Sequence, residues 1–254
     1  MKIILKYISW LIVGLWISFL FFPVLFIAVD ILNKINIFQA LTSIIERGDI
    51  LNSIKISFIT SFLCAFISTV IAFVSAYYIN RWHSNKKIIY LIIVYLPIFV
   101  PVLPLAIGAK SGISLAGISG NWLIPPLFQV TLSAPFAFAV LYYHLSFLPY
   151  SLELVAANFG ANKLIIMKDI ILPLLLPSFV IAFGVSFLIS WDEGIYSWVL
   201  SGFDSSFPVL IQEKLWSAKD ESVILSSVFL TVIAYIILVF LLAAQQQTIS
   251  KKNS

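Results

Sequence analysis

Six long apolar windows are the feature of this 254-residue sequence that most restricts its fold. A helix needs about 20 mostly apolar residues to cross the roughly 30 Å hydrocarbon layer of a bilayer. Windows of this kind lie near Ser9–Val29, Ile56–Ile79, Ile88–Gly108, Leu123–Tyr143, Pro173–Trp191 and Val223–Ala244. Each is continuously apolar, whereas a strand of a membrane barrel alternates over about ten residues. The sequence therefore predicts an all-α integral membrane protein with six transmembrane helices.

The composition excludes other classes of protein. Hydrophobic residues make up 61% of the chain and charged residues only 10%, whereas soluble proteins carry about 25% charged residues. Cys64 is the only cysteine, so a disulfide scaffold is excluded. The net charge of +4 is small and scattered, so no nucleic-acid partner is expected. Membrane lipid is the expected surrounding for most of the chain.

The distribution of charge predicts the orientation. If the two termini and the second and fourth loops share one side, that side has nine cations and two acids, a balance of +7. The other side then has six cations and nine acids, a balance of −3. Because cytoplasmic loops are enriched in Lys and Arg, we expect both termini in the cytoplasm. The first window is too long for a signal-peptide core and has no small-residue cleavage site, so we expect a retained helix.

Two of the spans have internal features with two interpretations each. Small side chains follow one stripe of the second span: Ser57, Ser61, Cys64, Ser68, Ala72 and Ser75. Such a stripe is a packing seam between helices or the lining of a polar pore. The third span contains Pro97, Pro101 and Pro104, which predict a bent or broken helix. This segment is either a wall of a passage or a kinked helix of the core.

No constellation of residues predicts catalysis by this chain. The sequence has no nucleophile with an adjacent base and no Gly-Lys-Ser phosphate loop. His83 and His144 have no Cys or carboxylate at ligand spacing, so we expect no metal site. We therefore expect a protein that is not itself an enzyme.

The segment between the fourth and fifth spans predicts a helix, a sharp turn and a second helix. Ser151 is expected to cap a first short helix that runs through Asn158, and Asn162 a second. Gly160 supplies the conformation that the turn needs, and Pro173 leads into the next span. The first short helix has an apolar side with Leu152, Leu154, Val155 and Phe159. A partner protein is the expected cover of this side.

This segment resembles the loop of the permease subunits of binding-protein-dependent ABC importers of type I. The family's loop contains Glu-Ala-Ala, three residues, Gly, nine residues, Ile, one residue and Leu-Pro. Here Leu154, Val155 and Ala156 precede Ala157, Asn158, Phe159 and Gly160, and nine residues later come Ile170, Ile171, Leu172 and Pro173. The spacing from Gly to Leu-Pro matches without a gap. The resemblance extends from the second span to the sixth.

The resemblance implies an architecture and a set of partners. It implies one transmembrane domain over residues 1–254, with a cytoplasmic coupling loop at residues 144–172 that docks into a cytoplasmic ATPase subunit. The other implied partners are a second permease subunit, either a paralogue or another copy of this chain, and an extracytoplasmic solute-binding protein. ATP and Mg would be bound by the ATPase, and this chain would bind no cofactor. The implied location is the plasma (inner) membrane of a bacterium.

One position of the loop departs from the family. Leu154 occupies the place of the family's carboxylate, and the nearest acid, Glu153, is one residue early. Adjacent helical residues point about 100° apart, which puts an ion pair with the ATPase at that place in doubt. Ala156, Gly160, Ile170, Leu172 and Pro173 match the family directly, and Val155 is a conservative match.

A second stretch resembles the spermidine/putrescine-type permeases, a subset with phosphonate and ferric-iron relatives. It starts at Ser190 and contains the acidic pair Asp192 and Glu193. Since successive helical residues diverge, at most one of these acids can face a central passage. We expect one of them to line the route of a cationic solute such as a polyamine, with Trp191 and Tyr196 offering ring faces. The alternative is a helix end whose acids bond to a neighbouring loop.

Two other classes of function compete with an ABC importer permease. A secondary transporter would need inverted repeats or charged residues deep in the membrane, and the sequence has neither. A scaffold protein would leave the apolar loop without a nucleotide-dependent role.

Overall fold

The computed structural model describes residues 47–202 except 83 and 85, residues 206–217, and positions scattered between 10 and 42. Every described position between 10 and 29 is helical, within the first predicted span. The sixth predicted span, and both termini, lie outside the described residues. Residues 52–210 form one compact unit, and residues 1–51 with 211–254 form a second. That the whole chain is one domain stays a prediction.

Three described helices are long and apolar enough to cross a membrane, and a bent pair supplies a fourth crossing if it counts as one span. The three long helices are α3 (Gly48–Arg81), α6 (Pro125–Ser146) and the continuous helix Lys163–Asp192. α3 and Lys163–Asp192 contain the second and fifth predicted spans, and α6 contains the fourth except its first two residues. No strand occurs among the described residues. Many large apolar side chains on these helices are exposed, as expected where lipid replaces water.

The third predicted span, Ile88–Gly108, contains a break, as its three prolines predicted. It consists of α4 (Lys87–Tyr95), the 3-10 turn η1 (Leu96–Phe99) and α5 (Val102–Leu115), bent by 95°. The break falls at Val100, which is extended with φ −94° and ψ 127°. A proline disfavours the α conformation of the preceding residue, so Pro101 explains this break. Pro104 lies in the first turn of α5, where helical N–H groups have no partner to lose.

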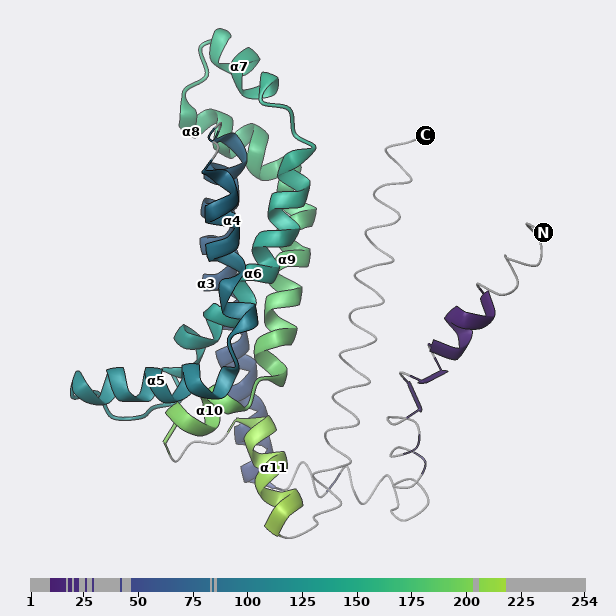
Figure 1. Ribbon diagram of the computed structural model, residues 1–254, viewed down its shortest axis with the longest axis vertical. Helices are drawn as coiled ribbons and strands as arrows, with labels where there is room; N and C mark the ends of the chain where they lie inside the picture. Colours follow the sequence, from purple (N-terminus) through teal and green to yellow (C-terminus); the bar gives the residue numbers. More distant parts are fainter. Residues whose placement is uncertain are drawn as a thin grey trace. The chain divides into compact units, whose positions relative to one another are not determined.

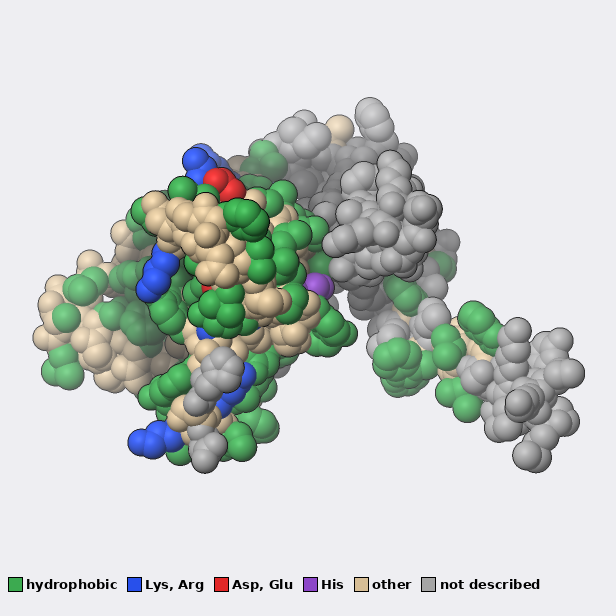
Figure 2. All heavy atoms as spheres, turned by 90° about the horizontal axis from the view of Figure 1, so that it is seen from above, with side chains coloured by type: hydrophobic (Ala, Val, Ile, Leu, Met, Phe, Trp, Pro, Cys, Tyr) green, Lys and Arg blue, Asp and Glu red, His purple; other side chains and the backbone are tan. Residues whose placement is uncertain are grey.

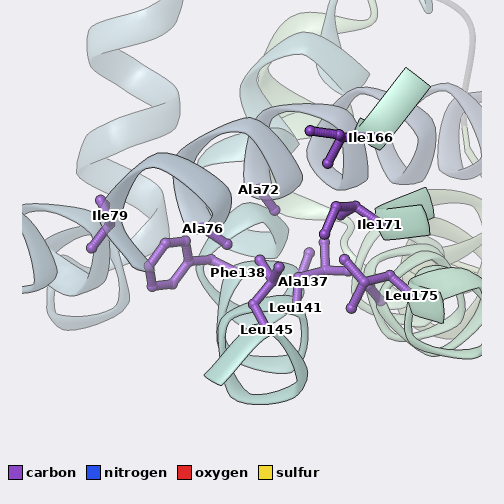
Figure 3. Packing of buried hydrophobic residues seen from close by; sticks show 11 residues of the cluster. Ala72, Ala76, Ile79, Ala137, Phe138, Leu141, Leu145, Ile166, Ile171 and Leu175 are labelled. Carbon is purple, nitrogen blue, oxygen red and sulfur yellow. The ribbon is translucent and has the colours of Figure 1, made fainter. Parts of the chain in front are cut away.

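The core of residues 52–210 lies where α3, α6 and α9 (Leu172–Asp192) meet. Small residues of α3, Ala72 and Ala76, face larger ones of α6, such as Phe138 and Leu141 (Figure 3). The continuous helix Lys163–Asp192 contributes Ile166, Ile171 and Leu175. Small side chains allow helix backbones to approach closely, so large and small residues interlock here. The four residues in the middle of the predicted stripe of small side chains are all buried: Ser61, Cys64, Ser68 and Ala72.

A polar contact crosses this seam between α3 and α6. The hydroxyl oxygens of Ser68 and Ser133 lie 2.6 Å apart, and Cys64 Sγ lies 3.3 Å from Ser133 Oγ. Because these groups bond to one another in the interior, the stripe is a packing seam in this chain and not a pore lining. Ser75, at the end of the stripe, is only half-buried.

A second layer lies at the opposite end of the bundle from α7 (Ser151–Asn158) and α8 (Lys163–Ile165) (Figure 1). It consists of α5 and the short helix α10 (Ile195–Leu200), which pack around Ala106, Tyr196 and Leu200. The backbones approach closely at Gly120, where an added Cβ would lie 2.9 Å from the Leu200 carbonyl oxygen. Glycine at this position therefore allows the loop after α5 to dock on α10.

The second unit contains the start of α3 and most of α11 (Phe207–Ser217). Within it, Asp49 forms ion pairs with Arg47, at 3.4 Å, and with Lys214, at 3.6 Å. Exposed ion pairs of this kind contribute little to stability, about 0 to 1 kcal/mol each.

Candidate functional site

The predicted coupling loop, residues 144–172, forms a helix, a turn and a second helix, as expected from the sequence. α7 follows the end of α6 after four residues, and its first residue is Ser151. The prediction that Ser151 caps this helix is wrong: Tyr150 occupies the N-cap and no side chain caps it. The backbone already turns at Pro149, whose carbonyl accepts a bond from the Leu152 N–H over 3.1 Å. The helix therefore starts one residue earlier than a Ser151 cap would require.

The turn depends on Gly160. Its φ is +88°, a left-handed conformation that costs a residue with a Cβ roughly 1–2 kcal/mol. The Gly160 N–H donates to the Ala157 carbonyl, and the Ala161 N–H donates to the Ala156 carbonyl. Asn162 then caps α8 as predicted, because its Oδ1 accepts the Ile165 N–H over 2.9 Å. Both local predictions for this turn are confirmed.

A widened π turn, η2 (Ile166–Ile171), connects α8 to α9. Within it the Leu172 N–H bonds to the carbonyl of Met167, five residues back. Pro173 follows and has no N–H, and its ring would clash with the carbonyl four residues before it. The wider turn accommodates this proline without breaking the helix. The fifth span is thus joined to the coupling loop by one continuous helix from Lys163, ten residues before the predicted start.

Glu153 faces the interior of the chain. Its residue exposure is only 8%. Tyr77 Oη donates to Glu153 Oε2 and Arg81 Nε to Glu153 Oε1, each over 2.8 Å. Ala156, one turn later, packs on the same core. The prediction placed Glu153 among the docking residues, but its carboxylate instead binds the end of α3.

The opposite side of the loop is apolar and open. Phe159 is 89% exposed and Leu154 50% exposed, and Leu152, Val155 and Leu164 are also exposed. Ala157 and Asn158 share this exposure. The possibility that Leu154 and Phe159 pack on the chain's own helices is therefore wrong for the described residues. Pro173 lies beyond the loop, on the helix that leads away from it. Of the predicted docking residues, Glu153 is buried and Ala156 half-buried, whereas those exposed are Leu154, Val155, Ala157, Asn158, Phe159 and Gly160.

Basic side chains surround this end of the bundle. Arg81, Lys86, Lys87, Lys163 and Lys168 all lie at helix ends or loops on the α7 side, and the described acids there are Glu153 and Asp169. Figure 2 shows the molecule from this end, with blue Lys and Arg among green apolar side chains. Such an excess of Lys and Arg is typical of a cytoplasmic face.

The acidic pair at the other end separates into two roles. Asp192 is the last residue of α9 and is exposed. Glu193 instead binds the start of α10: its Oε1 accepts the Ile195 N–H over 2.7 Å and the Tyr196 N–H over 3.0 Å. Its Oε2 accepts from Gln129 Nε2 of α6 over 3.0 Å. A carboxylate at a helix N-terminus is stabilised by the free N–H groups there.

The two aromatic residues of the predicted pathway are not equivalent. Tyr196 is 1% exposed; its hydroxyl lies 3.1 Å from Thr131 Oγ1, and its ring stacks on Phe128. Its ring face is therefore covered in this structure, which disfavours a cation–π role. Trp191 is half-buried and stacks on Phe187. The sequence analysis did not single out Gln129, Tyr77 or Arg81. The one signal in the sequence that points to them is a polar residue inside an apolar helix or at its end.

Comparison with known proteins supports one family. No family model matches the sequence. Over 143 residues the chain is 27% identical to the spermidine/putrescine transport system permease protein PotC of Haemophilus influenzae, a match that covers 56% of this chain and 55% of that protein. The chain resembles an ABC importer permease. The match spans about half the length of that relative, so the resemblance in sequence is partial.

Solved structures match the fold over nearly the whole chain. One is a chain of a bacterial ABC transporter involved in the import of the acidic polysaccharide alginate, with a TM-score of 0.73 and 18% identity over 96% of this chain and 95% of that chain. Another is the bacterial alginate ABC transporter in complex with an alginate pentasaccharide-bound periplasmic protein, with a TM-score of 0.72 and 19% identity over 93% and 92%. At such identities the likeness concerns the fold.

Proposed function

We propose that this chain is the membrane-spanning subunit of an ABC importer, which translocates a small solute while a separate subunit hydrolyses ATP. The observation that carries the proposal is the open apolar side of the coupling loop, formed by Leu154, Phe159 and their neighbours around the Gly160 turn. Exposed apolar residues of this density on a basic face require a cover other than lipid. A groove on a cytoplasmic ATPase is the cover that the loop motif implies.

The complete transporter in this proposal has four kinds of component. Two ATPase subunits bind ATP and Mg, and a second permease subunit, a paralogue or a second copy, completes the translocation path. An extracytoplasmic binding protein delivers the solute, which the likeness to an alginate transporter bound to a periplasmic protein supports. The chain would lie in the plasma (inner) membrane of a bacterium as a multi-pass protein, with both termini cytoplasmic. ATP-driven closure of the ATPases would move the docked loops and switch access to the path from one side to the other.

Purification tests this function directly. A tagged chain should isolate an ATPase, and adding the binding protein should raise the rate of ATP hydrolysis by the complex. A chain that isolates no ATPase from its native membrane, although it is folded and inserted, would contradict the proposal. A secondary transporter would instead take up solute in liposomes without any nucleotide.

A polyamine is the proposed solute. The resemblance to the permease PotC supports it, as does the exposed carboxylate of Asp192 at the end of α9. Acidity near the mouth of a passage raises the local concentration of cations. Phosphonate and ferric iron are the alternative solutes of related permeases. Because Glu193 is occupied by the N–H groups of α10, Asp192 is the stronger candidate for the route.

Uptake of labelled spermidine distinguishes these roles. Asp192→Asn should impair uptake without loss of the assembled complex, whereas Glu193→Gln should lower the thermal stability of the complex because it weakens the cap of α10. If Asp192→Asn, Glu193→Gln and the double variant all take up spermidine normally, the acids have only a structural role. An anionic solute in the binding protein would contradict the polyamine proposal.

A further inference from the structure

We propose that Glu153 is a positioning residue that ties the coupling helix α7 to α3, so that a movement of the loop is passed on to that span. This inference rests on the proposed function and adds a role for three residues, Tyr77, Arg81 and Glu153. Glu153 is the only acid on α7, and both of its carboxylate oxygens are bound by α3 over 2.8 Å.

The donors are arranged to hold one carboxylate. Tyr77 and Arg81 are four residues apart on α3, so their side chains lie on the same face of that helix. Each takes one oxygen of Glu153, which fixes the carboxylate in position and in orientation. The ion pair is sheltered, with side-chain exposures of 15% for Arg81 and 10% for Glu153. A hydrogen bond that carries charge is stronger and more directional than an apolar contact.

Arg81 also holds the chain that enters α7. Its Nη1 donates to the carbonyl oxygen of Leu148 over 2.9 Å, and its guanidinium carbon lies 5.7 Å from the centre of the Tyr150 ring. Arg81 thus contacts the segment before α7, the N-cap residue of α7 and, through Glu153, the helix itself. A displacement of α7 would have to break or carry along all three contacts.

The connectivity of the chain explains why such a tie matters. α7 is joined through the backbone to α6 on one side and, through α8, to α9 on the other. α3 is remote in sequence, since Arg81 and Glu153 are 72 positions apart. Elsewhere α3 meets α6 and α9 through small residues such as Ala72 and Ala76, through the Ser68–Ser133 contact and through ring contacts, and none of these involves α7. The Tyr77, Arg81 and Glu153 contact is the charged link between α7 and α3 among the described residues.

The chain offers a matched pair of variants for a test. Tyr77→Phe removes one hydroxyl that binds Glu153, and Tyr78→Phe removes the hydroxyl of the adjacent tyrosine, which is exposed and outside the contact. Each is purified in complex with the ATPase and reconstituted in liposomes. The measured quantity is the ratio of ATP hydrolysis with the binding protein to hydrolysis without it, at equal amounts of assembled complex. A purely structural defect lowers the amount of complex and leaves this ratio unchanged.

We expect Glu153→Gln to lower the ratio about fivefold or more, the lower end of ordinary coupling between distant sites. Tyr77→Phe should lower it less, and Tyr78→Phe should leave it at the wild-type value. The double variant Tyr77→Phe with Glu153→Gln should lose less than the product of the two single effects, because both remove the same contact. If Glu153→Gln fails to assemble, Tyr77→Phe against Tyr78→Phe still decides the question.

Equal ratios for Tyr77→Phe, Tyr78→Phe and the wild type, in complexes that contain the ATPase, would overturn this inference and leave the proposed function in place. A wild-type chain that isolates no ATPase would overturn both.

Discussion

At the scale of single residues, two positions of the predicted coupling loop matter for different reasons, Gly160 for its backbone and Leu154 for its side chain. Gly160 needs a left-handed backbone, and an added Cβ there would meet no atom within 4 Å. Substitution at this position therefore tests the conformation of the turn, without a steric clash with neighbours. Leu154 is half exposed in the isolated chain, and the proposed function expects a partner to cover it.

Gly160→Val should uncouple transport while the chain still inserts into the membrane. The strain of the left-handed conformation, about 1–2 kcal/mol, favours a different turn and so a different position of α7. Gly108→Ala is a matched control, because Gly108 is helical and also has open space around its Cβ position. Uptake and ATPase stimulation are measured for both variants. Normal values for Gly160→Val would show that the turn does not present α7 to a partner.

Leu154→Asp should weaken assembly with the ATPase about tenfold or more, as expected for an apolar anchor at the centre of an interface. Leu115→Asp serves as the control, since Leu115 is even more exposed but lies on α5 at the other end of the bundle. Titration of the ATPase against the purified chain measures both affinities. An unchanged affinity for Leu154→Asp would contradict the idea that an apolar contact replaces the family's carboxylate.

At the scale of elements, prolines decide how helices are joined. Pro101 ends α4 and η1 and turns the chain by 95° into α5, whereas Pro173 is accommodated by a π turn within a continuous helix. The difference follows from the neighbouring residue. Val100 adopts an extended conformation before Pro101, while Leu172 remains helical before Pro173. A proline motif therefore marks a disturbance of the helix without specifying its form.

The bend predicts how α5 lies if α4 runs along the membrane normal. A helix at 95° to that direction runs parallel to the membrane plane, so both of its ends lie at about the same depth. In a Cys64→Ser background, Leu103→Cys and Leu115→Cys should react at similar rates with an impermeant maleimide added outside. In a straight crossing, these positions would differ in depth by roughly 18 Å, from about 1.5 Å per residue. Much slower labelling of Leu103→Cys would contradict the in-plane position of α5.

At the scale of the whole molecule, the basic residues at the α7 end predict the orientation in the membrane. Arg81, Lys86, Lys87, Lys163 and Lys168 lie at that end, and the exposed Asp192 lies at the other. The bias is consistent with the balances of +7 and −3 over the full sequence. The α7 end should therefore face the cytoplasm, where an ATPase is available.

Reporter fusions measure this orientation. Alkaline phosphatase, which is active only outside the cytoplasm, should be inactive when fused after Ser84 or Gly160 and active when fused after Ser119. Replacement of Lys86, Lys87, Lys163 and Lys168 by Gln should reduce the difference between these fusions, because Lys and Arg set the orientation. An active fusion after Gly160 in the wild-type chain would place the coupling loop on the wrong side for a cytoplasmic partner.

Much of the fold and part of the site follow from local chemistry. Apolar windows predicted the three described helices that are long enough to cross a membrane, because the length of a crossing helix is set by the bilayer. The break before Pro101, the turn at Gly160 and the cap at Asn162 follow from backbone preferences of single residues. Such preferences act within a few residues and are therefore visible in the sequence.

Only the tertiary structure decided the partners of the polar residues. It directs Glu153 to Tyr77 and Arg81, attaches Glu193 to Gln129, and covers the ring of Tyr196. It also sets the size of the bend between α4 and α5. The polar contacts join residues that are 60 or more positions apart in the chain, and helix periodicity does not specify which helix faces meet. A buried carboxylate binds whichever donors the packing brings to it, because leaving it unpaired in the interior is costly.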